Sequence, residues 1–293
     1  MNNKTVYLEA LGVHSTVTTY LYCNFWQLWS AEHMGLDGYI NWPKDPSRCL
    51  NFLWDEAAFA RQPNAYEWYF EQPKVPSPPP RELVWTWENC PELGINPLMS
   101  QPLATIKAYF QKHLHFNSTV EARGQALVQQ YGINFDKTIG ITWRGTDIYL
   151  DGRPRLPIEV YFPFIDDVLA QEPDLRIMAT AEETGILGPL LARYPSAFVV
   201  EEFISAPNGS KNNPEKESVM QSISGFERGM QPVLMVWLFS KCKHLIKNRA
   251  STSAVASWLS TGRIVSLAHR ETLDYSKIPD HAEIEGQLVP LRR

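Results

Sequence analysis

The chain has 293 residues, enough for about two domains of the usual size of roughly 150 residues. Its 44% hydrophobic and 20% charged residues are typical of a globular protein. A formal net charge of −5 argues against a general nucleic-acid or anionic-membrane binder, whose affinity depends on clustered Lys and Arg. The sequence has no apolar run of about 18 residues, so it predicts no membrane span.

The N-terminus and the cysteines indicate a cytoplasmic protein. The chain runs into its first apolar segment without the h-region of a signal peptide. The cysteines have no Cys-x-x-Cys spacing, and we expect them to be reduced thiols because disulfides are rare in the cytosol. They are Cys23, Cys49, Cys90 and Cys242.

Residues 1–133 predict an N-terminal α/β domain. A short strand at Val6–Leu11 is closed by Gly12, and an aromatic-rich helical pattern follows over 18–34. A second strand is expected at 38–42, and helices at 55–62, 103–115 and 119–131. Residues 75–80 are Pro-rich and predict an extended segment.

Residues 134–270 predict a C-terminal Rossmann-like domain, because apolar strands alternate with helices. This alternation favours parallel strands joined by right-handed crossovers. The strands are expected at 138–143, 175–180, 197–201, 244–247 and 264–267. The helices between and after them are expected at 158–171, 184–193, 215–225, 232–241 and 253–259. Residues 271–293 are expected to form a tail that crosses back.

The residues just beyond the strand ends predict an anion site. The carboxyl ends of parallel strands share one edge of a sheet, and ligands bind in the crevice beyond it. An arginine there presents a planar fork to a phosphate, and hydroxyls at a helix start add an anion cradle. The residues expected to line this edge are Arg144, Asp147, Thr180, Glu182, Ser251, Thr252 and Ser253.

Each of these features has a structural interpretation. Ser251-Thr-Ser253 is a common N-cap pattern, Arg144 can pair with Asp147, and Glu182 suits a solvated first helical turn. The sequence lacks GxxxxGK[ST], GxGxxG and HExxH, and it has no Asp-x-Asp for a metal-bound sugar nucleotide. A bound diphosphate must therefore be neutralised by side-chain cations and helix ends, and no metal or other cofactor is expected.

Four ordered segments resemble motifs of the fucosyltransferase superfamily, which includes α-1,6- and α-1,2-fucosyltransferases, nodulation Z proteins and protein O-fucosyltransferases. Thr142-Trp-Arg-Gly-Thr-Asp147 resembles its His-x-Arg-Arg-x-Asp motif, and Pro157-Ile-Glu-Val-Tyr161 its Pro-Ile-Glu-x-Tyr motif. Ala179-Thr-Ala-Glu-Glu183 is similar to its Ala-Thr-Asp-Asp segment. The stretch 239–259 is similar to its third motif, in the α-1,2 form.

The resemblance implies a GT-B architecture, in which two Rossmann-like domains face each other across a cleft. Residues 134–270 would then bind the donor, and residues 1–133 would lie on the acceptor side. It implies GDP-fucose as donor, a carbohydrate acceptor and inverting transfer without metal. Arg144 would contact the β-phosphate, and Ser251, with Thr252 or Ser253, would contribute a diphosphate hydroxyl. Asp147 would brace the motif loop, and the Gly12 loop is compatible with the N-terminal half of the family.

Departures from the family pattern keep a second hypothesis open. Thr142 stands where the motif has His, Gly145 replaces its second Arg, and Gly152 replaces an acidic residue. Asp151 is therefore our candidate for the base that accepts the acceptor's proton, with His14 or Glu9 as alternatives. The rival hypothesis is a catalytically silent glycan- or nucleotide-binding protein on the same fold. Aromatic residues that could stack on sugars are Trp26, Tyr66 and Trp68.

Overall fold

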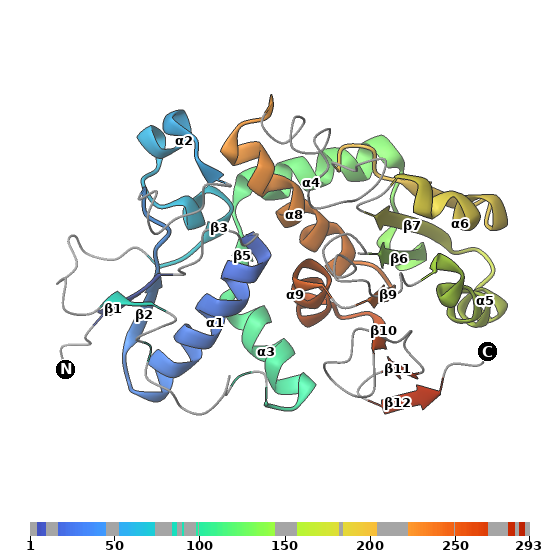
Figure 1. The fold of residues 1–293 in the computed structure, drawn as a ribbon, viewed down its shortest axis with the longest axis horizontal. Coiled ribbons are helices and arrows are strands. Elements are labelled where there is room, and N and C mark those ends of the chain that lie inside the picture. The colour runs from blue at the N-terminus through green and yellow to red at the C-terminus, as the bar shows by residue number, and fades with distance from the viewer. Residues whose placement is uncertain are drawn as a thin grey trace. The chain divides into compact units, whose positions relative to one another are not determined.

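The computed structural model shows a mixed α/β chain with parallel sheets (Figure 1). It describes residues 5–9, 17–44, 53–73, 84–86, 90, 98, 100–143, 157–181, 184–203, 222–248, 250–268, 281–284 and 287–290. The chain divides into two units. One comprises Met1–Gly124 and Ile223–Leu234, and the other Gln125–Ser222 and Met235–Arg293.

The first unit is built on a three-stranded parallel sheet in the order β2-β1-β4. These strands are β1 (Thr5–Leu8), β2 (Asp37–Ile40) and β4 (Val84–Trp85). A second small sheet pairs β3 (Phe70–Glu71) with β5 (His115–Phe116) in antiparallel orientation. The helices of this unit are α1 (Val17–His33), α2 (Glu56–Arg61), the 3₁₀ helix η2 (Ala65–Trp68), α3 (Leu103–His113) and the start of α4 (Ser118–Tyr131).

Aromatic packing holds the first unit together. Phe25 of α1 stacks on Phe110 of α3, with ring centroids 4.3 Å apart. Trp42 lies in an edge-on contact with Tyr66, at 5.3 Å, and both are buried. Such rings bury large apolar areas, and their paired geometry adds to the stabilisation. The aromatic-rich stretch after Gly12 is therefore largely core.

The second unit contains a seven-stranded sheet in the order β12-β11-β10-β9-β6-β7-β8. Strands β10, β9, β6, β7 and β8 are parallel, while β11 and β12 extend one edge of the sheet with antiparallel strands. The strand bounds are β6 (Thr138–Trp143), β7 (Arg176–Ala181), β8 (Ala197–Val199), β9 (His244–Asn248), β10 (Arg263–Ala268), β11 (His281–Ile284) and β12 (Gln287–Pro290). The tail expected to cross back thus contributes its described residues to the sheet of this same unit.

Helices lie on both faces of the large sheet because its connections run in two directions. The step from β6 to β7 goes one way, while β8 to β9 and β9 to β10 go the other way. Right-handed crossovers then place the helices of the two sets on opposite faces. The first set includes the 3₁₀ helix η5 (Ile158–Tyr161), α5 (Phe162–Gln171), the 3₁₀ helix η6 (Thr184–Leu187) and α6 (Gly188–Arg193). The second includes α8 (Gly225–Ser240) and α9 (Ser251–Leu259).

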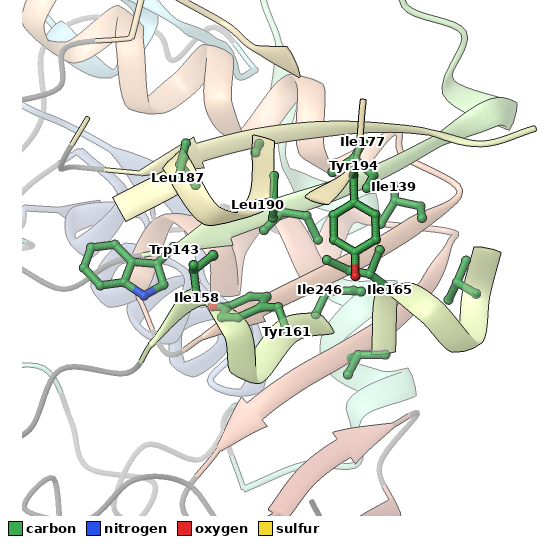
Figure 2. Close-up of a cluster of buried hydrophobic side chains, with 14 of the residues drawn as sticks. Ile139, Trp143, Ile158, Tyr161, Ile165, Ile177, Leu187, Leu190, Tyr194 and Ile246 are labelled. Atoms are coloured by element: carbon green, nitrogen blue, oxygen red, sulfur yellow. The ribbon is translucent and has the colours of Figure 1, made fainter. Parts of the chain in front are cut away.

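The main core of the second unit lies between the sheet and its first set of helices. Ile158 and Tyr161 of η5 and Leu190 of α6 point toward Ile139 and Ile246 on the strands (Figure 2). Burying a side chain of this size contributes about 1.5–3 kcal/mol. The opposite face is also closely packed, since a Cβ placed on Gly140 of β6 would lie 2.7 Å from the Phe239 ring of α8.

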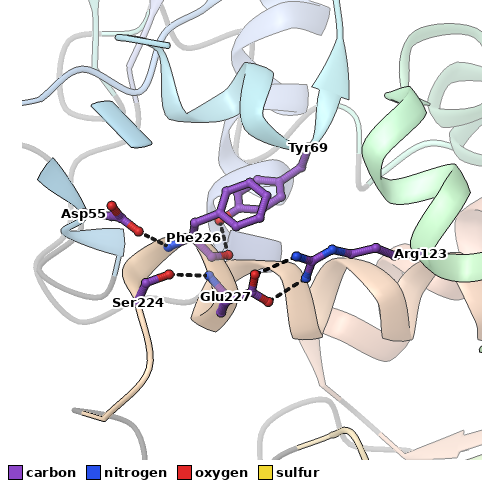
Figure 3. A network of polar contacts seen from close by, with 6 residues as sticks. All are labelled: Asp55, Tyr69, Arg123, Ser224, Phe226 and Glu227. Atoms are coloured by element: carbon purple, nitrogen blue, oxygen red, sulfur yellow. Dashed lines mark hydrogen bonds and ion pairs between the residues drawn. The ribbon is translucent and has the colours of Figure 1, made fainter. Parts of the chain in front are cut away.

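Two helices pass from one unit to the other. The division falls within α4, after Gly124, and within α8, after Leu234. Helix α8 begins at Gly225 and contains Pro232, whereas the sequence predicted a break and a helix starting at residue 232. Side chains from the first unit hold the start of α8, which explains its earlier beginning (Figure 3).

Among the described helices, none has the length and apolar character needed to cross a membrane. The described cysteines Cys23, Cys90 and Cys242 are free thiols, while Cys49 lies outside the described residues. Burial raises the pKa of the Cys23 thiol to about 11, which keeps it protonated at neutral pH.

Candidate functional site

The carboxyl edge of the large sheet carries a topological switch point between β6 and β9. These neighbouring parallel strands are separated in sequence by β7 and β8, which lie on the far side of β6. The described helices that follow β6 in sequence, η5 and α5, lie on one face of the sheet, and α9, which follows β9, lies on the other. In open α/β sheets this divergence opens a crevice beyond the strand ends, where ligands bind.

A row of polar side chains crosses the sheet just inside this edge. Thr142 of β6 lies opposite Thr180 of β7 on one side and opposite Lys247 of β9 on the other. Lys247 in turn lies opposite Ser266 of β10. Residues in register on adjacent strands point to the same face, so these four side chains share one face. The preceding row, which joins the apolar core of the other face, is Ala179, Ile141, Ile246 and Val265.

This polar row is buried. Thr180, Thr142 and Lys247 are only 3%, 7% and 8% exposed. The ammonium of Lys247 donates to the Ser266 hydroxyl at 3.2 Å. The Oγ1 atom of Thr142 has no hydrogen-bond partner among the described residues. Of these residues, the sequence predicted only Thr180 as part of a site.

Helix α9 starts at the same edge, directly after β9. Ser251, Thr252 and Ser253 form its first turn, whereas the sequence predicted a helix that begins only at Ser253. Ala250 is the N-cap and provides no side-chain capping hydrogen bond. The Ser253 hydroxyl donates to the Asn248 carbonyl at 2.8 Å, so its proton is used within the fold and its lone pairs remain as acceptors.

The end of β6 is also held by Tyr161 of η5, which packs on the core face of the sheet, opposite the polar row. The hydroxyl of Tyr161 donates to the Thr142 carbonyl at 3.0 Å, and both residues are buried. Tyr161 belongs to the Pro-Ile-Glu-x-Tyr-like segment found in the sequence. That segment therefore orients the strand end from which Arg144 follows, and it need not touch a ligand to do so.

The carboxyl edge of the first unit's sheet carries a second polar group. Glu9 directly follows β1 and is 5% exposed. Its backbone N–H donates to the Trp85 carbonyl at 2.8 Å, and its Oε1 accepts from Asn41 Nδ2 at 2.8 Å. Asn41 itself directly follows β2, so the two strand ends are tied together through this carboxylate.

Helix α1 supports this edge with two buried amides. Gln27 Nε2 donates to the carbonyls of Glu9 and Trp85 at 3.3 and 3.1 Å. Asn24 Nδ2 donates to Gln27 Oε1 at 2.7 Å, and its Oδ1 accepts from Trp42 Nε1 at 2.8 Å. Because buried polar groups must be paired, these amides fix α1 against the strand ends and hold Glu9 in place.

Several solved structures share the architecture of the chain. NodZ α-1,6-fucosyltransferase soaked with GDP-fucose matches with a TM-score of 0.55 and 14% sequence identity, over 99% of this chain and 100% of that one. NodZ from Bradyrhizobium matches with a TM-score of 0.53 and 14% identity, over 100% of both chains. A mutant of Arabidopsis thaliana FUT1 in complex with GDP gives 0.50 and 11% identity, over 96% of this chain and 75% of that one.

The chain has the fold of the GT-B fucosyltransferases. The expected α/β class and the resemblance read from the motifs are thereby confirmed at the level of the fold. No protein-family model matches the sequence, and no curated protein matches it in sequence. At 14% identity, conserved geometry and not overall sequence relates the chain to these fucosyltransferases.

Most of the site residues predicted from the sequence lie outside the described part of this fucosyltransferase-like fold. They are Gly12, His14, Arg144, Asp147, Asp151 and Glu182. Thr180, Ser251, Thr252 and Ser253 are described, and all four lie at the carboxyl edge of the large sheet. Within the described residues, no group of three or more His, Cys, Asp or Glu side chains is arranged to hold a metal ion.

The aromatic residues proposed for sugar stacking lie mainly in the core of the first unit. Tyr66 and Trp68 are buried, and Trp68 packs edge-on against Phe59 with centroids 4.6 Å apart. Trp26 is half-buried, and its Nε1 has no hydrogen-bond partner within the described parts of the chain. Tyr66 and Trp68 thus serve packing of the core.

Proposed function

We propose that this protein is an inverting glycosyltransferase that transfers fucose from GDP-fucose to a glycan or related carbohydrate acceptor without a metal ion. The observation that carries the proposal is the polar carboxyl edge at the switch point, on a fold shared with a fucosyltransferase solved with GDP-fucose. Ligand binding at this position is the general behaviour of such sheets. The motifs at residues 142–147 and 239–259 add support from the sequence.

The proposed donor site uses side-chain cations, hydroxyls and a helix start in place of a metal. Arg144 contacts the β-phosphate, Asp147 braces its loop, and Ser251 with Thr252 contributes hydroxyl donors, since the proton of Ser253 is used within the fold. Gly12, Thr180 and Glu182 complete the donor contacts. As the bond between the anomeric carbon and the diphosphate breaks, negative charge accumulates on the leaving oxygen. Donors placed there stabilise the transition state more than the ground state.

The acceptor oxygen attacks the anomeric carbon from the side opposite the leaving diphosphate, which inverts its configuration. The hydroxyl proton passes to a base, for which Asp151 is our first candidate and His14 and Glu9 are alternatives. Among the three, Glu9 is described, and it is a carboxylate held at the end of β1 by Asn41. A base of this kind contributes about 10²–10⁴ in rate.

A thermal-shift panel tests donor binding directly. GDP and GDP-fucose are compared with other sugar nucleotides, each with and without EDTA. At a ligand concentration about 100-fold above Kd, we expect a stabilisation of about 2.7 kcal/mol that EDTA leaves unchanged. If no sugar nucleotide shifts the melting temperature, the transferase proposal is wrong. A shift abolished by EDTA contradicts only its metal-free part.

The rival function is a catalytically silent binder of nucleotides or glycans. The sequence favours it at one point, because Gly145 replaces the second arginine of the motif. A tritiated GDP-fucose donor, offered with a broad panel of acceptors, separates the two. Transfer or slow hydrolysis supports an enzyme, whereas nucleotide binding without either supports the silent binder.

A further inference from the structure

A pocket of about 680 Å³ lies along the edge strand β2 in the first unit. Its volume falls within the range of roughly 300–1,000 Å³ that is usual for small-molecule sites. Thr5 and Asp37 line it from the amino ends of β1 and β2. Glu9 and Asn41, which follow the carboxyl ends of the same strands, are not among its lining residues. The pocket is therefore separate from the edge that carries the candidate base Glu9.

Strand β2 directs backbone groups into this pocket. Ile40 turns its N–H and its C=O away from β1, and the Gln72 side chain binds them at 3.1 and 2.9 Å. The next residue, Asn41, instead donates its N–H to the Leu8 carbonyl of β1. Because successive residues of a strand alternate in this way, Gly38 directs its N–H and C=O to the same side as Ile40. As part of an edge strand, Gly38 offers the pocket one donor and one acceptor.

Two carboxylates add acceptors to the pocket. Asp37 and Glu71 both line it and both are exposed. Neither carboxylate makes a hydrogen bond or ion pair with another described residue. Glu32, on the neighbouring wall, is already paired, since its Oε1 lies 3.1 Å from His113 Nε2 and 3.6 Å from Lys112 Nζ. The acceptors that remain for a ligand are therefore those of Asp37 and Glu71.

The chemistry of the lining favours a neutral ligand that carries many hydroxyls. Three carboxylates line the pocket against one lysine and two histidines, which disfavours a phosphate or another anion. Apolar side chains also line it, namely Leu28, Leu36 and Pro73. A sugar ring has hydroxyls on its rim and C–H groups on its faces, so it uses both kinds of lining. Few polar groups placed among apolar ones are what a specific small-molecule site requires.

We propose that this pocket is a carbohydrate-binding site. Sugar hydroxyls donate to Asp37 and Glu71 and pair with the Gly38 backbone, and a C–H face of the ring packs against Leu36 and Pro73. The site is additional to the proposed donor site and does not depend on it. The competing ligand is a cationic amine, which would use the carboxylates alone. An ammonium group needs only acceptors, whereas Gly38 also presents an N–H donor, and this difference favours the sugar.

A printed array of neutral, amine-bearing and acidic oligosaccharides, used without nucleotide, selects the probe, and calorimetry measures its affinity. We expect neutral oligosaccharides to bind, and Asp37→Ala combined with Glu71→Ala to weaken binding at least about tenfold. Asp37→Asn combined with Glu71→Gln keeps the oxygen acceptors and should retain most of the affinity. Glu121→Ala is the matched control, because Glu121 lies on α4 of the same unit and does not line the pocket. It should leave the affinity unchanged.

The outcomes separate this inference from the donor proposal. If no oligosaccharide binds the wild type, or if the alanine pair binds as well as the wild type, the inference is wrong. Equal losses in the amide and alanine pairs, with binding that weakens in about 0.5 M salt, would identify an amine site and also overturn it. Loss of oligosaccharide binding with unchanged GDP affinity supports it. A wild type that binds no GDP-sugar overturns only the donor proposal. Should the alanine pair fail to fold by circular dichroism, the two single alanine variants decide by the same criterion.

Discussion

The guanidinium of Arg123 binds both carboxylate oxygens of Glu227, at 2.5 and 2.7 Å (Figure 3). This bidentate pair joins α4 to α8 within the first unit. Both side chains are about 40% exposed, at 42% and 40%, so solvent screens the pair. We expect a double-mutant cycle of Arg123→Met and Glu227→Gln, each of which removes the charge, to give a coupling of about 0.5–1 kcal/mol in urea unfolding. A coupling that stays the same in 1 M salt would contradict this assignment.

Gly225, the first residue of α8, should not tolerate a methyl group. A Cβ at this position would lie 2.3 Å from the backbone oxygen of Leu53, which cannot move as a side chain can. We expect Gly225→Ala to destabilise the protein by about 1–3 kcal/mol. Gly188→Ala is the control, because a Cβ there meets nothing within 4 Å and alanine favours helix. Urea midpoints should fall for the first variant and stay level or rise for the second.

Asp55 should make stability depend on pH in the acid range. Burial tends to raise the pKa of this carboxyl, but hydrogen bonds from the Ala58 N–H, Ser224 and the Phe226 N–H lower it more, to below its ordinary value of 3.8. A depressed pKa means that the stabilisation is complete above pH 3.8 and is lost as the pH falls through the folded-state pKa. Asp55→Asn should therefore flatten the loss of stability below about pH 4. A variant at exposed Asp167 serves as control, and an unchanged acid slope in Asp55→Asn would contradict the assignment.

The strands and helices of the second unit were largely predictable because each follows from a local pattern. The fully buried strand β6 matches its expected range, and β7, β9 and β10 differ from theirs by a residue or so at the ends. The unit boundary was not predictable, since α4 continues through Gly124 as one helix although glycine is a poor helix former. The start of α8 was missed because its support comes from Asp55 and Tyr69, which are distant in sequence.

The sequence predicted where the candidate site lies, but it did not predict all of the residues that form it. Residues that follow strand ends, such as Ser251, are recognisable because they lie between an apolar run and a helix. Lys247 and Thr142 lie inside strands, and their pairing depends on β9 lying beside β6. No local pattern encodes that strand order. Sequence reasoning therefore found the edge of the sheet and Thr180, but it missed Thr142, Lys247 and Ser266, the other members of the polar row.

Arg144→Lys tests the expected role of the motif arginine. Lysine keeps the charge but loses the two-pronged geometry that matches a phosphate. Since a charge-assisted contact contributes about 2 kcal/mol, we expect donor affinity or turnover to fall at least about tenfold while the fold is retained. Titration and initial-rate kinetics measure both quantities. Values within about twofold of the wild type would assign Arg144 to a structural ion pair, for example with Asp147.

Asp151→Asn separates the enzyme from the silent binder. Asp151 follows Arg144 by seven positions in the sequence, and a carboxylate there is suited to accept the acceptor's proton. The substitution is nearly isosteric, so nucleotide binding should remain while transfer falls at least about 100-fold, the contribution typical of a general base.

Glu9→Gln, measured in the same assay as Asp151→Asn, tests whether Glu9 at the end of β1 is the base instead of Asp151. Gln keeps an oxygen that can accept from Asn41 Nδ2, so the strand ends should stay tied while the negative charge is lost. If Asp151→Asn transfers normally and Glu9→Gln lowers the transfer rate about 100-fold, the base is Glu9 of the first unit. Normal transfer by both variants leaves His14, whose substitution by Gln should then abolish transfer without weakening GDP binding.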